Sequence, residues 1–297
     1  MINSSIYITG HSGFVGKNLL KYLINYDFIK HKKNDIFSID ENIVIHLIGK
    51  AHDLKKSSNP DDYYAVNTNL TKNIFDEFLK SNAKTFILLS SVKAVADKCS
   101  DVLFENVIPD PKTHYGKSKL LAENYILNFN LPENKKVYIL RPCMVYGNGN
   151  KGNLNLLYKV ISKGYPWPLG SFDNLRSFCS IENLNFVIKQ LVENENIPSG
   201  VYNVCDDKPI STNDLVKLIS KSRNTKSRII NIPKLIIRLL AYFGDIFKMP
   251  INSERLSKLT ENYIVSNKKI KSVLQKKLPV DIKKGLFDTF KNFNYND

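Results

Sequence analysis

The stretch Ser5-Ile6-Tyr7-Ile8-Thr9-Gly10-His11-Ser12-Gly13-Phe14-Val15-Gly16 decides the fold of this 297-residue chain. A short apolar strand pattern runs into three glycines at three-residue spacing, and a helical pattern follows from Asn18 to Ile24. Gly10 and Gly13 let the backbone approach a pyrophosphate, Gly16 lets helix and strand pack closely, and the free N–H groups of the helix start attract the anion. Because the strand before and the helix after are both present, the stretch predicts a phosphate-binding loop rather than an ordinary glycine-rich turn.

Two further patterns carry reactive side chains. Thr85–Ser91 is a buried-type strand that ends in two hydroxyls, and parallel α/β sheets bind ligands at the carboxyl ends of their strands. Tyr115 and Lys119 stand four residues apart beside an apolar helical pattern that runs to Phe129, so one helix face carries both. A nearby ammonium favours phenolate, so we expect Lys119 to lower the pKa of Tyr115 from about 10 and let it exchange protons near neutrality.

The glycine stretch, the strand Thr85–Ser91 and the helix with Tyr115 and Lys119 follow one another along the chain. In this order they resemble the extended short-chain dehydrogenases/reductases, the family of nucleotide-sugar epimerases, dehydratases and ketoreductases. Thr9–Gly16 is similar to its cofactor loop, Val44–Gly49 to its fourth strand and Val66–Leu70 to the following helix. Leu140–Gly147 resembles the strand and loop that cover the nicotinamide. The resemblance implies an α/β fold with a doubly wound parallel (Rossmann) sheet and a smaller C-terminal substrate lobe.

The resemblance also implies the organisation of the chain. Residues 1–147 would form the dinucleotide-binding domain and residues 148–297 the substrate lobe. A helix at Asn183–Glu193 and a strand at Val201–Val204 belong to a segment, 177–205, that we expect to pack back on the first domain.

The family resemblance assigns roles to individual residues. Ser91 would hydrogen-bond the substrate oxygen, Tyr115 would be the acid/base, and Lys119 would hold the nicotinamide ribose. The residues expected to bind the cofactor are Gly10, Gly13, Phe14, Val15, Gly16, Lys32, Lys33, Asn67, Tyr115, Lys119 and Pro142.

The second half of the chain resembles the segments that hold a UDP-sugar. By this similarity Asn153 and Arg176 would contact the pyrophosphate, with Arg255 a weaker candidate, and a planar guanidinium suits phosphate oxygens. Lys93 follows Ser91 closely and either faces the substrate or remains solvated. In the 4,6-dehydratases an Asp-Glu pair follows the catalytic hydroxyl residue, whereas Val92 and Lys93 stand here, so dehydratase chemistry is not expected.

The segments His46–His52 and Ser90–Val95 are most similar to enzymes of bacterial surface polysaccharide synthesis. This similarity implies hydride transfer from NAD(P)H to the 4-keto group of a UDP-4-keto-6-deoxy-N-acetylhexosamine. Two alternatives stay open: a UDP-hexose or UDP-N-acetylhexosamine 4-epimerase with tightly bound NAD, and a catalytically silent nucleotide-binding protein of the same fold.

The connection from the first helix to the strand at Ile43 is short, only Tyr26 to Asn42, where the family fits two strands and a helix around the adenine. We therefore expect a shallow adenine pocket and an exchangeable cofactor. The second strand ends in Lys30-His31-Lys32-Lys33 rather than an acidic residue, which favours NADP(H). NAD(H) stays open if Asp35 or Asp40 supplies a carboxylate.

Composition narrows the partners and the compartment. The formal net charge is +15, but the lysines are scattered, so no nucleic-acid partner is expected, although the charge should attract dianionic nucleotide sugars. Four widely spaced cysteines and a first strand close to the start predict a cytoplasmic protein without a signal peptide. The residues His11, His46, His52 and His114 lack metal-ligand spacing, so we expect no metal and structural roles for them.

Two apolar patterns could form contacts with a membrane or with a second copy of the chain. Ile229–Phe247 is the most apolar stretch, but charges and a proline interrupt it, so packing in the substrate lobe is expected and peripheral membrane contact is the alternative. Apolar residues on two helices resemble the family's dimer interface and predict a homodimer; these are Tyr64, Leu70, Ile74 and Phe78 with Leu121, Tyr125 and Phe129.

Overall fold

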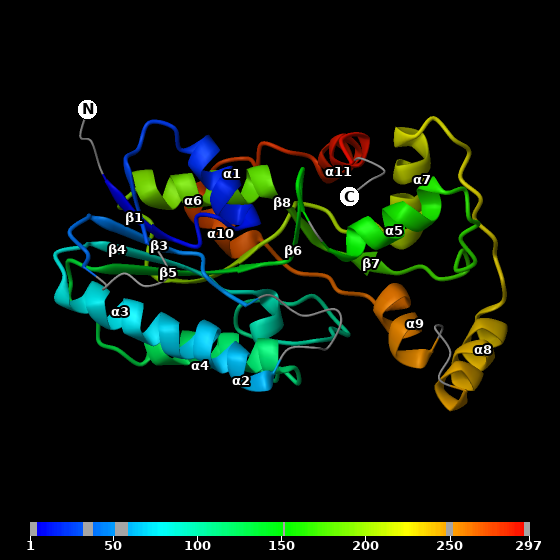
Figure 1. The fold of residues 1–297 in the computed structure, drawn as a ribbon, viewed down its shortest axis with the longest axis horizontal. Helices are drawn as coiled ribbons and strands as arrows, with labels where there is room; N and C mark the ends of the chain where they lie inside the picture. The colour runs from blue at the N-terminus through cyan, green and yellow to red at the C-terminus, as the bar shows by residue number, and fades with distance from the viewer. Residues whose placement is uncertain (1–4, 32–37, 51–58, 151, 248–251, 294–297) are drawn as a thin grey trace.

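The computed structural model describes residues 5–31, 38–50, 59–150, 152–247 and 252–293. Its centre is a six-stranded, wholly parallel sheet in the order β2-β1-β3-β4-β5-β9 (Figure 1). The strands are β1 Ile6–Thr9, β2 Phe28–Lys30, β3 Ile43–His46, β4 Thr85–Leu89, β5 Lys136–Pro142 and β9 Gly200–Val204. The chain runs outward from β1 to β2 and then crosses to β3 on the other side of β1. This reversal opens a crevice at the carboxyl ends of β1 and β3, and the expected Rossmann fold is confirmed.

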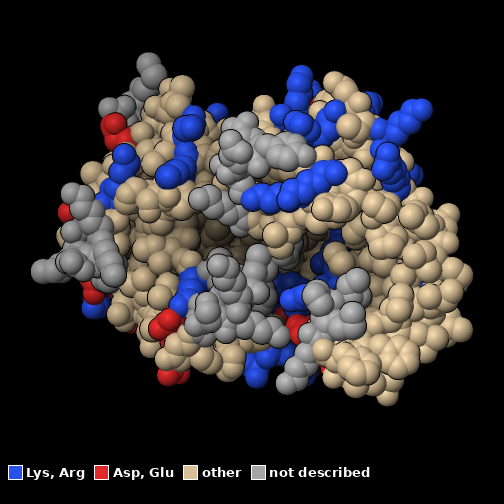
Figure 2. Space-filling view, turned by 45° about the vertical axis from the view of Figure 1, so that its right-hand side comes forward, with Lys and Arg blue, Asp and Glu red and all other residues tan. Residues whose placement is uncertain are grey.

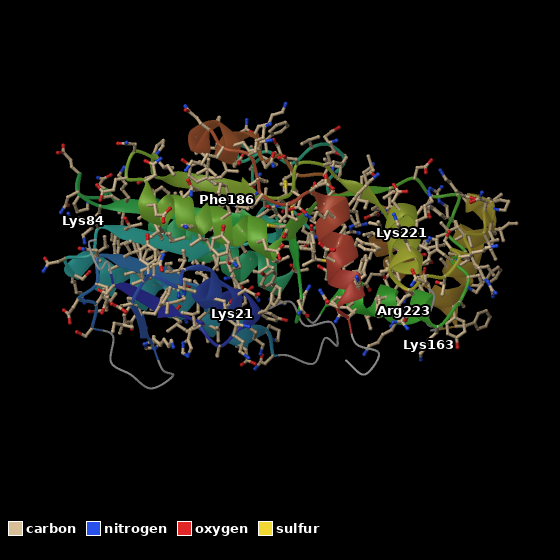
Figure 3. The ribbon with its side chains drawn as sticks, turned by 90° about the horizontal axis from the view of Figure 1, so that it is seen from above. Lys21, Lys84, Lys163, Phe186, Lys221 and Arg223 are labelled. Carbon is tan, nitrogen blue, oxygen red and sulfur yellow. The ribbon has the colours of Figure 1, made fainter. Side chains whose placement is uncertain are left out.

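Helices cover both faces of the sheet. On one face lie α1 (Phe14–Tyr22) and α6 (Ile181–Glu193), which contact each other; Figure 3 labels Lys21 and Phe186 on them. On the other face α3 (Leu70–Lys80) packs beside α4 (His114–Leu127) (Figure 1). α2 (Pro60–Tyr63) runs through a π-helical turn at Tyr64–Asn69 directly into α3, and α10 (Lys268–Leu274) contacts β9.

The remaining elements build a lobe around a second apolar core. The helices α5 (Asn153–Ser162), α7 (Thr212–Ser222) and α11 (Ile282–Lys291) surround it, together with the buried Trp167. Two small sheets connect the lobe to the parallel sheet. They pair β6 (Met144–Tyr146) with β8 (Phe178–Ser180) and β7 (Leu175–Arg176) with β10 (Ile210–Ser211). The chain leaves the main sheet after β5 and returns to it with α6 and β9 before α7.

Two residues expected at a dimer interface lie in the monomer core instead. Ile74 and Phe78 on α3 are fully buried and pack with Phe86 of β4. Their apolar stripe faces the sheet, so the interface prediction is wrong for these two residues. On α4, Leu121 and Phe129 at its end are exposed.

The apolar stretch 229–247 forms α8 (Lys234–Ile246), followed after an interval by α9 (Ser253–Thr260). The expectation that it packs in the lobe is wrong for most of α8, which buries only Ile237, Ala241 and Gly244. Within the described residues, no helix has the length and apolar character needed to cross a membrane.

Candidate active site

The glycine loop between β1 and α1 has the shape of a pyrophosphate cradle. Gly10 has a φ of 73°, and a Cβ on Gly16 would lie 2.3 Å from the Gly10 carbonyl oxygen, so larger residues would disrupt both positions. α1 starts after Gly13 without a side-chain cap, which leaves the N–H groups of its first turn, at Phe14 and Val15, for an anion. The buried Nδ1 of His11 in this loop also has no hydrogen-bond partner within the described chain. These features fit a bound dinucleotide.

Lys119 lies between the carboxyl ends of β3 and β4. Its Nζ donates a hydrogen bond to the Leu89 carbonyl oxygen at 3.0 Å, and a Cβ on Gly49 would approach Nζ to 2.9 Å. Burial lowers the pKa of Lys119 to about 8, while the carboxylate of Glu123 opposes the shift. The ammonium is thus held at the carboxyl edge of the sheet, beside the switch-point crevice of β1 and β3.

Tyr115 and Ser91 meet at the same edge of the sheet. The Tyr115 ring stands edge-on to the buried Tyr63, with centroids 6.3 Å apart. Burial raises the pKa of the Tyr115 phenol, while its hydrogen bond with the Ser91 hydroxyl lowers it by less. The expected lowering of this pKa is therefore wrong: desolvation outweighs it, and the Lys119 ammonium is bonded to the Leu89 carbonyl. Tyr115 is consequently a protonated phenol at neutral pH.

A buried ion pair behind these residues was not predicted from the sequence. Arg141, near the end of β5, donates through Nε and Nη2 to the Glu123 carboxylate at 3.0 and 2.5 Å, and both side chains are almost wholly buried. The Ser90 hydroxyl also donates to Glu123. Glu123 follows Tyr115 and Lys119 at successive four-residue steps on α4, a periodicity that could have revealed it. The hydrogen bonds among Ser90, Glu123 and Arg141 connect α4 to the ends of β4 and β5.

Asn67, which is expected to bind the cofactor, joins two parts of the chain by hydrogen bonds. Its Nδ2 donates to the Ser118 hydroxyl at 3.0 Å and to the Lys50 carbonyl at 3.2 Å, while its Oδ1 accepts from the Lys50 N–H at 2.8 Å. The fully buried amide thereby joins the loop after β3 to α4. Asn67 positions that loop and Lys119's helix.

Two cations from different parts of the chain lie close together beside Tyr263. The Lys93 Nζ lies 4.1 Å from the Tyr263 ring centroid and donates to the Asp97 carbonyl at 2.8 Å. The Arg176 guanidinium donates to the Lys258 carbonyl, and the Arg176 backbone bridges to Tyr263. Burial lowers the pKa of Lys93 to about 8, and the nearby charge of Arg176 adds to this shift although Asp97 opposes it. Two partly buried like charges of this kind suit an anionic ligand.

A buried amide lies two residues before Arg176 in the chain. Asn174, next to β7, is buried, and neither atom of its amide has a hydrogen-bond partner within the described residues. Figure 2 shows one side of the molecule hollowed near its middle, with Lys and Arg side chains around the hollow.

The remaining predicted residues are less informative. Pro142 is the buried last residue of β5, and Arg255 lies exposed on α9, with its N–H bonded to Asn252. Lys32 and Lys33, and the side chain of Asn153, lie outside the described residues.

Three of the histidines expected to be structural can be placed. His46 is fully buried between the Thr9 and Thr71 hydroxyls, and burial lowers its pKa to about 3. His114 pairs with the Tyr64 hydroxyl, and His11 lies in the glycine loop; His52 is outside the described residues. Among the residues that the structure describes, no group of three His, Cys, Asp or Glu side chains is arranged for a metal ion.

Known proteins resemble this chain over nearly its full length. It is 29% identical to a UDP-glucose 4-epimerase of Vibrio cholerae, over 97% of this chain and 95% of that protein. It is 30% identical to the N-acetyl-alpha-D-glucosaminyl-diphospho-ditrans,octacis-undecaprenol 4-epimerase of Escherichia coli O157:H7, over 91% of this chain and 85% of that protein. A solved dTDP-4-dehydrorhamnose reductase of Bacillus anthracis in complex with NADP shares the fold, with a TM-score of 0.75, 19% identity and coverage of 98% of this chain and 100% of that one.

Residues 6–205, from β1 through β9 and its following residue, match the NAD dependent epimerase/dehydratase family. That span contains the glycine loop, Ser91, Tyr115 and Lys119, so the family match and the geometry concern the same residues. The chain belongs to the NAD dependent epimerase/dehydratase family.

Proposed function

We propose that this chain is a nucleotide-sugar oxidoreductase that reduces the 4-keto group of a UDP-4-keto-6-deoxy-N-acetylhexosamine in surface polysaccharide synthesis. The observation that carries the proposal is the protonated Tyr115 phenol, hydrogen-bonded to Ser91 and carried on the same helix as the buried Lys119 ammonium, at the carboxyl edge of the sheet. A phenol that is protonated at neutral pH is prepared to donate to an alkoxide, which is the direction of reduction.

The nicotinamide, when bound, supplies the hydride. The loop Gly10–Gly16 would hold its pyrophosphate, and Lys119 would hold its ribose. Ser91 hydrogen-bonds the substrate oxygen, and Tyr115 gives that oxygen its proton. The buried ammonium of Lys119 then stabilises the phenolate that Tyr115 becomes, because charge interactions strengthen where water is excluded.

A nucleoside diphosphate is the group we propose for the cations of the lobe. Arg176 and Lys93 lie together beside Tyr263 and are partly buried, so their charges would be compensated by a pyrophosphate. Asn153 and Arg255 are proposed as further contacts to the same group. The net charge of +15 would speed the approach of such a dianion.

NADP(H) is the proposed cofactor. β2 ends at the exposed Lys30, and Lys32 and Lys33 follow it in the sequence, where a 2′-phosphate would find cations rather than a carboxylate. The described structure has only β2 between α1 and β3, which supports a shallow adenine site and a cofactor that exchanges.

A 4-epimerase is the second candidate. The Vibrio cholerae and Escherichia coli relatives are both named as 4-epimerases, and each matches nearly the whole chain. In that case the same tyrosine would act first as base and then as acid, on a UDP-sugar or on a lipid-linked sugar diphosphate such as the Escherichia coli relative's name specifies.

The two candidates differ in how they hold the cofactor. The protein should be purified without added nucleotide, tested for retained NAD, and titrated with NADPH and NADH. It is then incubated with UDP-4-keto sugars and with UDP-glucose and UDP-N-acetylglucosamine. Reduction of a keto sugar by exchangeable NADPH supports the reductase; stoichiometric retained NAD with interconversion of 4-epimers rejects it in favour of the epimerase.

We also propose that the chain forms a homodimer through α4 and the adjoining part of the α2–α3 helix. The exposed Leu121 and Phe129 and the half-buried Tyr64 and Tyr125 remain available on these helices. A mass measurement in solution tests this proposal.

A further inference from the structure

α8 is apolar nearly all round, yet it stands at the edge of the lobe (Figure 1). Its buried positions, Ile237, Ala241 and Gly244, form one narrow stripe. The large apolar side chains outside that stripe are between 47% and 70% exposed; the main ones are Leu235, Leu239, Leu240, Tyr242, Phe243 and Phe247. A helix that is hydrophobic on every side is normally covered, and a contiguous exposed apolar surface of this kind marks a contact site.

The charges around α8 indicate what covers it. From Lys226 to Phe247, the segment that leads into α8 and α8 itself, the chain carries four Lys or Arg residues and a single acidic residue, Asp245. Lys234 and Arg238 stand on α8 itself, and Lys226 and Arg228 on the segment that leads into it. Apolar side chains flanked by cations are the combination that binds the surface of an anionic bilayer.

A second copy of the chain fits this surface less well. A symmetric dimer through α8 would bring together two surfaces that each carry four Lys or Arg residues and one acidic residue between Lys226 and Phe247. Glu254, an acidic residue on the neighbouring α9, is already paired with Lys258. The charge pattern therefore favours an anionic partner over self-association.

The position of α8 connects this surface with the candidate site. α8 packs against α9, and the Lys258 carbonyl of α9 accepts the hydrogen bond from the Arg176 guanidinium. Lys98, from the loop after β4, also reaches α9 through Ser257 and Glu261. One helix thus separates the exposed apolar surface from the cations proposed to bind the diphosphate.

We propose that α8 docks the protein on an anionic lipid bilayer, with its exposed apolar side chains inserted among the headgroups and the flanking cations on the anionic lipids. Docked in this way, the site beside Arg176 lies one helix from the membrane surface. This placement rests on the second candidate function above, in which the substrate is a sugar diphosphate carried on a lipid.

The test is flotation of the full-length protein with phosphatidylcholine vesicles prepared with and without phosphatidylglycerol. The parent should bind the vesicles containing phosphatidylglycerol, and added salt should weaken the binding. The double variant Leu235→Glu/Leu239→Glu should bind at least about tenfold more weakly, because it places carboxylates at the interface. The matched control is Ile24→Glu/Ile108→Glu, which makes the same charge change at exposed apolar positions outside α8 and should bind like the parent.

Phe247→Glu, at the exposed end of α8, provides a second variant if the double variant does not fold. Absence of parent binding, or an equal loss in the control variant, overturns the proposal. The proposal is also overturned if the parent is a dimer that the α8 variants dissociate and the control variant does not, because a second copy of the chain would then cover α8. Turnover of a water-soluble UDP-sugar should be the same in parent and α8 variants, so failure of docking and failure of the proposed function are distinguished.

Discussion

Replacing Glu123 by Gln should destabilise the protein by about 3–5 kcal/mol, the cost of removing one partner of a buried ion pair. Glu123 is wholly buried, Arg141 is 5% exposed, and their hydrogen bonds include one of 2.5 Å. Glutamine keeps the shape but not the charge, and the Arg141 guanidinium cannot deprotonate in response. Its Nη1 already lacks a hydrogen-bond partner within the described residues, so the charge would have little compensation.

The assay is urea unfolding followed by far-ultraviolet circular dichroism, with the parent and both variants analysed at the same slope. Asp214→Asn is the control: it breaks the ion pair with Lys217, in which both side chains are about half exposed, and should cost no more than about 1 kcal/mol. The double variant Glu123→Leu/Arg141→Met should recover most of the loss, because no charge is then left buried. A loss for Glu123→Gln no larger than that of the control would refute the reasoning.

The same change should alter the pH dependence of turnover. The Glu123 carboxylate favours the ammonium form of Lys119, whose pKa burial has already lowered to about 8. Without the carboxylate that pKa falls further, so the alkaline decline in activity should begin at a lower pH. An unchanged alkaline limb would mean that Lys119 does not control it.

Tyr115→Phe should lower turnover by at least about 100-fold with cofactor affinity preserved, and near-normal turnover would reject Tyr115 as the proton donor. Arg176→Ala should weaken UDP binding in calorimetry by about 2–4 kcal/mol, and more than Arg255→Ala does; equal affinities for UDP in parent and Arg176→Ala would place the diphosphate elsewhere. His46 has a pKa of about 3 when folded, against 6.5 for an unperturbed histidine, so the unfolded state binds the extra proton and stability should fall as pH decreases from about 6.5 toward 3. In His46→Gln the unfolding free energy should depend less steeply on pH in that window, and an identical slope would contradict the buried neutral imidazole.

The sequence alone determined the local parts of this protein. The glycine loop, the strand before it and the helix after it are specified by residues adjacent in the chain, and so is the placement of Tyr115 and Lys119 on one helix. Such features depend on backbone geometry over a few residues, and they were sufficient to predict the parallel sheet and the family.

Tertiary structure decided everything that depends on neighbours distant in the chain. Apolar periodicity identified the stripes of α3 and α8 but not what covers them: Ile74 faces the sheet, whereas Leu235 faces solvent. The partnership of Glu123 with Arg141, and the raised pKa of Tyr115, likewise arise only after folding. Burial and electrostatic environment are sums over contacts from separate segments, and a pattern read along one segment does not contain them.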